Sequence, residues 1–210
     1  TYQSAWLKTH YPAEFLAGVM THDPGMYPKR LLLAEARRLG VRILPIDVNK
    51  STNEYLVERA PRKTVDHSVI KTDEPEIAIR MALTDIQAIS EPEIARIIAE
   101  QPFVDLPDFF LRAKPSRRTL ESLALVGALD GLVGQNEIAS TRGDILARVR
   151  QLNAIKTKPR SHENQPTLDF SVIDSLPTGN PEMSRSERAG AEYSLTKLDV
   201  TEHLIESFRP

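Results

Sequence analysis

The sequence predicts a mainly α-helical, α+β protein: short helices, one small β-hairpin, and a polar linker before a last helix. Two observations lead to this class. Apolar residues recur at three- and four-residue spacing along most of the chain, and several of these segments begin at a proline or serine suited to a helix N-terminus. Only between residues 41 and 84 does the pattern change to the two-residue alternation of a strand.

The first 40 residues are predicted to be helical. A break before Pro12 separates two helices within residues 1 to 24, because proline suits the first turn of a helix. A third helix, over residues 28 to 39, is expected to stop at Gly40, since glycine readily takes the left-handed conformation that ends helices. The apolar stripes expected to face the core are Phe15, Leu16, Val19 and Met20 in the second helix, and Leu32, Ala36 and Leu39 in the third.

From Val41 the chain is predicted to leave the helix through an extended piece and then to form a β-hairpin from NEYLVER and IAIRMALT. In the second segment, large apolar residues at positions 77, 79, 81 and 83 alternate with smaller or polar ones, which is typical of a half-buried strand. A hairpin this small must pack on the helices to be stable.

Four short helices are predicted after the hairpin. Ser90 and Glu93 have the spacing of a capping box, a second helix starts at Pro107, and Ser116 caps a third. The fourth is expected from about Asn136 to Leu152. The predicted core residues are Ile94, Ile97, Ile98, Phe109, Phe110, Leu111, Leu120, Leu123, Ala124, Gly127, Ile138, Ile145, Leu146 and Val149.

Residues 153 to 182 are rich in Pro, Ser, Lys, Asn and Thr. Such a composition cannot bury enough apolar surface to offset the entropy of ordering, so a flexible linker is predicted. Residues 183 to 210 have helical character.

Composition limits the possible functions. No run approaches the ~18 apolar residues of a membrane span, so no membrane partner is expected. The absence of cysteine excludes disulfides and thiolate chemistry and permits a cytoplasmic location. The N-terminus lacks Met and resembles no signal peptide, and it is expected to lie inside a longer protein. The net charge of −2 argues against a uniformly basic nucleic-acid binder.

Basic residues are nevertheless clustered. The segment RAKPSRR holds Arg112, Lys114, Arg117 and Arg118 with no acid between them. Residues 141 to 160 hold six basic residues against Asp144 alone. A cluster of this kind is either a solvated face or a phosphate-contacting surface, and the residues by themselves leave both interpretations open.

No catalytic centre is found in the sequence. The nine glycines never have the spacing of a phosphate-binding loop, the five histidines lie too far apart for a zinc site, and no paired strand carboxylates are present to hold two metals. Asp47 is interpreted as a turn-forming residue, with Asn49 and Ser51, rather than as a metal ligand. No cofactor is expected in this chain. If the chain belongs to an enzyme, the active site is expected to lie outside this sequence.

Four segments, taken in order, carry a family resemblance. They resemble successive motifs of bacterial C-family DNA polymerases, the alpha subunits of DNA polymerase III: YQSAWLKTHYPAEFLAGVM, AEARRLGVRILPIDVNKS, IAIRMALTDIQAISEPEIARIIAEQPFVDLPDFFLR and RRTLESLALVGALDGL. The segment DPGMYPKRLLLAEARRLGV is closer to the error-prone branch of that family, whereas LPIDVN is closer to the replicative branch. We favour the error-prone branch.

The resemblance implies a fragment that binds DNA and the sliding clamp, while the palm with its metal-binding aspartates lies upstream. Mg²⁺ would therefore belong to the parent polymerase, a nucleotidyltransferase. The implied divisions are the end of the fingers domain (1–40), a clamp-binding-type domain with a β-hairpin and a helix-hairpin-helix (41–152), a linker (153–182) and a C-terminal helical segment (183–210). The implied partners are DNA, the bacterial sliding clamp, and other replisome or lesion-synthesis proteins.

The chain departs from the family at one hairpin. The family usually has G-V-G there, so that backbone amides can approach a DNA phosphate, and the aligned residues here are Ala88, Ile89 and Ser90. Alanine and serine take positive φ poorly, so this contact is expected to be weakened. The candidate DNA-binding residues are these three and, somewhat favoured over them, Lys114, Arg117 and Arg118.

The linker contains the peptide NQPTLDF. Its Gln165, Leu168 and Phe170 match the longer Q-x-x-L-x-F form of bacterial clamp-binding peptides. Glutamine offers both a donor and an acceptor to a polar subsite, while leucine and phenylalanine suit an apolar cleft. The alternative is a chance apolar spot in a linker.

Two other functions remain open for the whole chain. One is a stand-alone helix-hairpin-helix DNA-binding module. The other is a structural, protein-binding helical domain without DNA affinity, which the net charge of −2 and the missing hairpin glycines favour.

Overall fold

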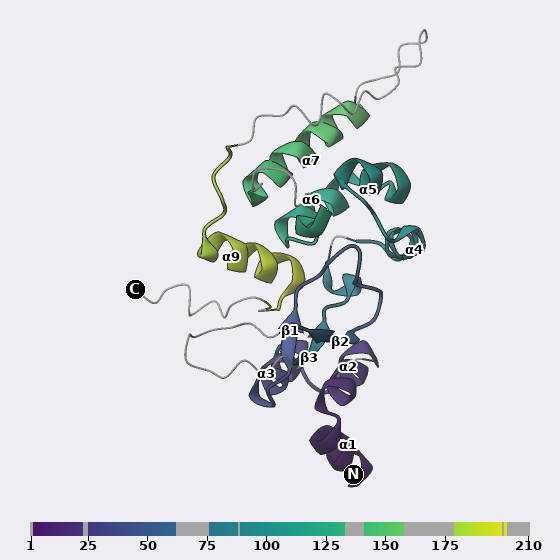
Figure 1. The fold of residues 1–210 in the computed structure, drawn as a ribbon, viewed down its shortest axis with the longest axis vertical. Coiled ribbons are helices and arrows are strands. Elements are labelled where there is room, and N and C mark those ends of the chain that lie inside the picture. Colours follow the sequence, from purple (N-terminus) through teal and green to yellow (C-terminus); the bar gives the residue numbers. More distant parts are fainter. Residues whose placement is uncertain are drawn as a thin grey trace.

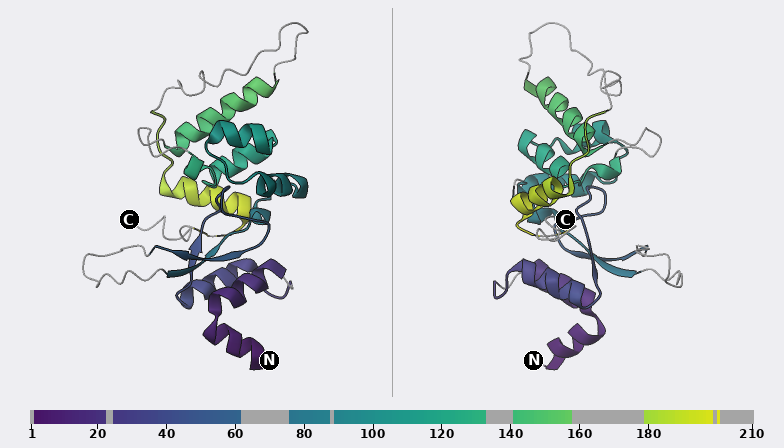
Figure 2. Two further views of the ribbon diagram at one scale, coloured as in Figure 1. Left: turned by 45° about the vertical axis from the view of Figure 1, so that its right-hand side comes forward. Right: turned by 90° about the vertical axis from the view of Figure 1, so that its left-hand side faces the viewer.

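The computed structural model describes residues 2–22, 25–61, 76–87, 89–132, 141–157, 179–198 and 200. A small sheet separates two groups of helices, with α1 to α3 on one side and α4 to α9 on the other (Figures 1 and 2). The predicted mainly α, α+β class is confirmed. In the described part of the chain, no helix is both long and apolar enough to span a membrane.

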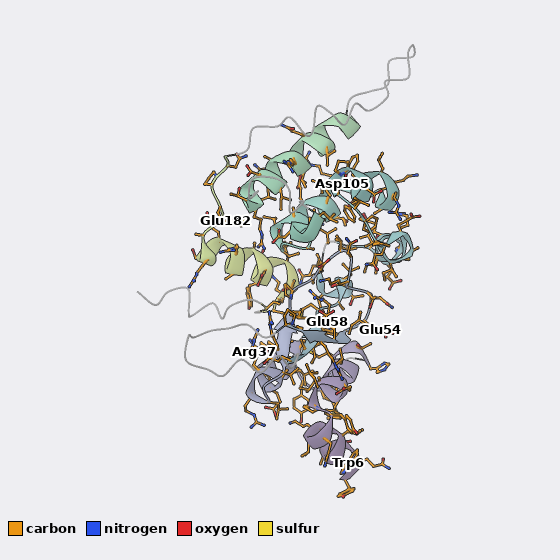
Figure 3. The ribbon with its side chains drawn as sticks, viewed as in Figure 1. Trp6, Arg37, Glu54, Glu58, Asp105 and Glu182 are labelled. Carbon is orange, nitrogen blue, oxygen red and sulfur yellow. The ribbon has the colours of Figure 1, made fainter. Side chains whose placement is uncertain are left out.

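The N-terminal helices are α1 (Tyr2–His10), α2 (Pro12–His22) and α3 (Lys29–Arg38). Gly40 ends the third helix as predicted: its φ is +77°, and the next amide donates back to the Ala36 carbonyl at 2.9 Å. Leu16 and Met20 are buried, but the buried leucine of α3 is Leu33, whereas Leu32 and Leu39 are half-buried. Trp6 lies on α1 at the end of the molecule remote from the sheet (Figure 3).

The sheet has three strands, β1 (Arg42–Leu44), β2 (Leu56–Ala60) and β3 (Glu76–Arg80). Their order is β1-β3-β2, in which β3 pairs antiparallel with β2 and parallel with β1. The predicted hairpin is therefore confirmed, and the predicted extended piece becomes a third strand that flanks it.

The predicted half-buried alternation in β3 is wrong. The strand ends at Arg80 and is followed by the 3₁₀ helix η1 (Leu83–Asp85), and three successive residues, Ala78, Ile79 and Arg80, are all buried. The reason is that β3 is the central strand with apolar cover on both faces. Ile79 joins the main core with the helices, while Ala78 packs with Leu44 and Ala60 in a second cluster.

The remaining helices are α4 (Glu91–Glu100), α5 (Leu106–Ala113), α6 (Arg117–Leu125), η2 (Asp130–Leu132), α7 (Arg142–Thr157) and α9 (Arg185–Thr196). Ser90 and Glu93 form the predicted capping box, and Ser116 caps α6 as predicted. Leu111 was predicted to be buried and is 45% exposed, since the helix buries Phe109 and Phe110 on its other side.

The predicted limits of α7 are also wrong. Thr141 is not helical and caps the helix instead: its hydroxyl accepts from the Asp144 amide, and its own amide donates to Asp144 Oδ2, both at 3.1 Å. The helix continues past Leu152 to Thr157, so the first residues of the predicted linker are helical. Ile138 lies outside the described residues, while Ile145 and Val149 are buried as predicted.

One hydrophobic core runs from α2 and α3 through the sheet to α4, α5, α6 and α7. Because the core is shared, the turns between the later helices are held in fixed positions relative to the sheet. Those turns carry the exposed basic residues that the sequence singled out.

Candidate nucleic-acid interface

Two turns between short helices form the candidate site. The first hairpin is the turn at residues 86–90 between η1 and α4, and the second hairpin is the turn at residues 113–116 between α5 and α6. Both lead into a helix N-terminus that is capped by a serine, Ser90 or Ser116. Backbone amides and the positive end of the helix dipole meet at such places.

The first hairpin uses its amides within the chain. The Ile89 N–H donates to the Ile86 carbonyl at 3.2 Å. The Ser90 N–H donates to Glu93 Oε2 at 3.3 Å, and the Ser90 hydroxyl donates to the same oxygen at 2.8 Å. Ala88 lies outside the described residues. An amide–phosphate contact at Ile89 and Ser90 stays a prediction, and it would have to replace these internal bonds.

The second hairpin presents cations to solvent. Lys114 takes the left-handed conformation, with φ 46° and ψ 50°, between the buried residues Ala113 and Pro115. Lys114, Arg117 and Arg118 are all exposed. Arg117 makes an i,i+4 ion pair with Glu121 at 3.0 Å, whereas Lys114 and Arg118 have no ion pair with any residue in the described ranges.

Arg112, the fourth member of this sequence cluster, has an internal role. Its guanidinium donates to Glu100 Oε2 at 3.2 Å, to Asp108 Oδ2 at 3.1 Å and to the Pro102 carbonyl at 2.9 Å. It also lies over the ring of Phe103, 5.1 Å from the centroid. With its donors engaged, Arg112 joins α4 to α5 and is not available to a ligand in the way its neighbours are.

Helix α4 holds both ends of the second hairpin. Glu93 Oε1 accepts from the Ser116 amide at 2.7 Å, and one turn further along the helix Arg96 Nε donates to the Ala113 carbonyl at 3.2 Å. Burial acts to raise the pKa of Glu93, but hydrogen bonds from Ser116 and Ser90 outweigh it and lower that pKa to about 2. The carboxylate is therefore ionised at neutral pH. The sequence predicted the Ser90 contact from its spacing, but nothing in it indicated the tie to Ser116.

The second basic cluster is partly internal as well. Arg142, at the start of α7, pairs with Asp130 at 2.7 Å, and its side chain is 11% exposed. Its backbone amide donates to Glu182, which lies in the segment leading to α9 (Figure 3). Arg150 is exposed. The contacts of Arg142 serve to hold α7 against the turn after α6.

The remaining residues that the sequence suggested do not belong to the two hairpins. Gln165, Leu168 and Phe170 lie outside the described residues. Asp47 forms a turn as predicted, since its Oδ1 accepts from the Asn49 amide at 2.9 Å and its carbonyl from Ser51 at 2.8 Å. Lys8, on α1, pairs with Glu35 on α3 at 2.7 Å. Within the described ranges, no three His, Asp or Glu side chains gather as a metal site would require.

Comparisons with known proteins identify a matching family model and several relatives. Residues 40–139 match a family model described as a helix-hairpin-helix motif, a range that covers the sheet and both hairpins. The chain is 32% identical to an error-prone DNA polymerase of Symbiobacterium thermophilum over 99% of its own length. It is 38% identical to those of Corynebacterium efficiens and Dechloromonas aromatica over 65% and 66% of its length. It spans 21%, 11% and 12% of these three relatives, respectively.

Proposed function

We propose that this chain, which is homologous to a segment of the bacterial error-prone DNA polymerases, binds DNA on behalf of such a polymerase and performs none of its chemistry. The single observation that carries the proposal is the exposed basic turn at Lys114, Arg117 and Arg118, inside the region that matches a helix-hairpin-helix motif. Cations on a rigid turn at a helix N-terminus suit a DNA phosphate, which is bound by charge and by N–H donors.

Catalysis is assigned to the remainder of the parent protein. The relatives are named as error-prone DNA polymerases, and this chain accounts for 21% of the length of one of them. In this proposal the rest of the parent binds Mg²⁺ and joins deoxynucleotides to a primer end. The residues described here hold the DNA during that reaction.

A second binding function is proposed for the segment between α7 and α9. The Gln165, Leu168 and Phe170 pattern fits a peptide that enters a polar and apolar cleft of the bacterial sliding clamp. A peptide of this kind that is ordered on binding has modest affinity, and tethering to a DNA-bound polymerase converts that affinity into processivity. The clamp acts in the bacterial cytoplasm, and the proposal locates the chain there, with other lesion-synthesis proteins as further partners.

Isothermal titration calorimetry with a bacterial sliding clamp tests this peptide. Micromolar binding that disappears when Gln165, Leu168 and Phe170 are all changed to alanine would support the tether. Undetectable binding by the unmodified chain would contradict it and would favour recruitment by another protein.

The strongest competing function is a protein-binding helical domain without DNA affinity. It is favoured by the internal use of the Ile89 and Ser90 amides and by the net charge of −2. A salt titration of DNA binding decides between the two. Phosphate contacts make affinity fall steeply with salt, with a slope of about −0.9 per neutralised phosphate. A domain without DNA affinity shows no measurable binding at any salt concentration.

A further inference from the structure

We infer that Glu93 is a positioning residue for DNA binding. It ties the second hairpin to the first, so that the cations at residues 114–118 meet the phosphates of the DNA backbone in fixed positions. This inference rests on the proposed DNA-binding function. It assigns a role to an acidic residue at a site whose other candidates are cations or backbone amides.

The geometry behind the inference is a shared acceptor. The two carboxylate oxygens of Glu93 divide their contacts between the hairpins: Oε2 accepts from the Ser90 amide and hydroxyl, and Oε1 accepts from the Ser116 amide. The Glu93 residue is 9% exposed, whereas Ser90 and Ser116 lie at the surface, so the carboxylate is buried beneath its two donor residues. A buried carboxylate that receives several N–H and O–H donors is a strong joint, because each bond is charge-assisted.

The bonds made by helix α4 hold the second hairpin, the turn that carries Lys114. Arg96 holds the Ala113 carbonyl at one end of the second hairpin, and Glu93 holds the Ser116 amide at the other. Between these two points Lys114 keeps a left-handed conformation that a non-glycine residue seldom takes. Helix α4 therefore holds the backbone on both sides of Lys114.

Two glutamates on the same helix provide a matched comparison. Glu91 is exposed in the first turn of α4, two residues from Glu93. Glu91→Gln and Glu93→Gln each remove one negative charge and keep the shape of the side chain. Removal of a charge alone should strengthen DNA binding in both variants. Only Glu93→Gln also places an amide NH₂ among donors that need an acceptor, so it loosens the second hairpin.

The experiment measures binding of the whole chain to a primer–template oligonucleotide duplex by fluorescence anisotropy over a salt series. The expected result is that Glu91→Gln binds at least as tightly as the unmodified chain, whereas Glu93→Gln binds about fivefold more weakly and its salt slope falls by about 1. A smaller folded fraction would weaken binding without changing the slope, so the slope separates positioning from general destabilisation.

Circular dichroism and the ¹⁵N-resolved shift of the Ser116 amide check that Glu93→Gln is folded and that the bond is lost. If that variant does not fold, Arg96→Lys, which keeps the charge but removes the planar guanidinium, replaces it with the same expected loss of affinity and slope. Binding by the folded variant that equals or exceeds that of Glu91→Gln, with an unchanged slope, would overturn the inference. Absence of DNA binding by the unmodified chain would instead overturn the proposed function.

Discussion

Asp144 holds Asn180, 36 residues further along the chain, through two hydrogen bonds to one carboxylate oxygen. Oδ1 accepts from the Asn180 amide and from its side-chain Nδ2, each at 3.0 Å. The same oxygen accepts from Gly179 at 3.1 Å, and Oδ2 accepts from the Thr141 amide at 3.1 Å. This one buried carboxylate therefore both caps α7 and binds the segment that leads to α9.

Replacement of Asp144 by asparagine should lower the free energy of unfolding by about 2 kcal/mol, because the donors lose a charged acceptor and one of them meets a competing NH₂ group. Urea denaturation at pH 7 measures this loss. The control is Asp108→Asn, a change at a more exposed carboxylate, and it should lower the free energy of unfolding by less. Equal stability of the Asp144 variant and the unmodified chain would contradict the account.

The contribution of Asp144 should also depend on pH in one direction. Burial acts to raise its pKa, but the hydrogen bonds from Asn180, Thr141 and Gly179 outweigh burial and hold that pKa well below the ordinary value of 3.8. A pKa that is depressed in the folded state gives stability that is complete above the unfolded value and is lost as the pH falls through the folded one. The difference in unfolding free energy between the unmodified chain and Asp144→Asn should shrink as the pH falls below 3.8. A difference that grows on acidification would have the wrong sign.

The partly buried ion pair of the sheet, Arg80 with Glu58, should respond unequally to removal of its two members. The Arg80 side chain is 7% exposed, against 29% for its partner Glu58, and it also donates to the Pro45 carbonyl. Glu58→Gln leaves a buried cation without its counter-charge and should cost about 3 kcal/mol. Arg80→Met leaves a carboxylate that can reach water and should cost about 1 kcal/mol. Chemical denaturation of both variants measures the order, and the reverse order would refute this explanation.

Two glycines with the same backbone conformation should tolerate alanine differently. Gly40 and Gly127 have φ of +77° and +79°, so alanine is strained at both. A Cβ at Gly40 meets nothing within 4 Å, and Gly40→Ala should cost about 1 kcal/mol. At Gly127 the new atom would lie 2.1 Å from the Arg142 guanidinium and would displace its pairing with Asp130. Gly127→Ala should therefore lower the melting temperature clearly more than Gly40→Ala, and equal shifts would contradict the predicted crowding.

The local signals in the sequence located most helix boundaries correctly. Gly40, Ser90 and Ser116 act on their nearest neighbours in the chain, so the residues themselves carry the information about where a helix ends or begins. The start of α7 differs from the prediction because apolar residues continue upstream of residue 141. Thr141 and Asp144 have the spacing of a capping pair, and this pair begins the helix.

What the sequence could not predict depends on contacts between distant segments. The two-sided burial of β3 follows from its central place, which requires knowing that β1 pairs with it. The basic cluster was visible, but only the structure separates Arg112, which is bound by Glu100 and Asp108, from the exposed Lys114 and Arg118. The Glu93–Ser116 bond joins residues 23 positions apart and has no local signature.

The salt dependence of DNA binding tests the central claim most directly. The unmodified chain is compared with the triple variant Lys114→Gln, Arg117→Gln and Arg118→Gln, and with a control variant that changes three exposed basic residues elsewhere, Arg30, Lys50 and Arg59, to glutamine. The first variant should lose at least about tenfold in DNA affinity, and its salt slope should fall by about 2 to 3, while the control changes little. Equal losses in the two variants, or an unchanged slope in the first, would show that the turn at residues 114–118 is not where this protein holds DNA.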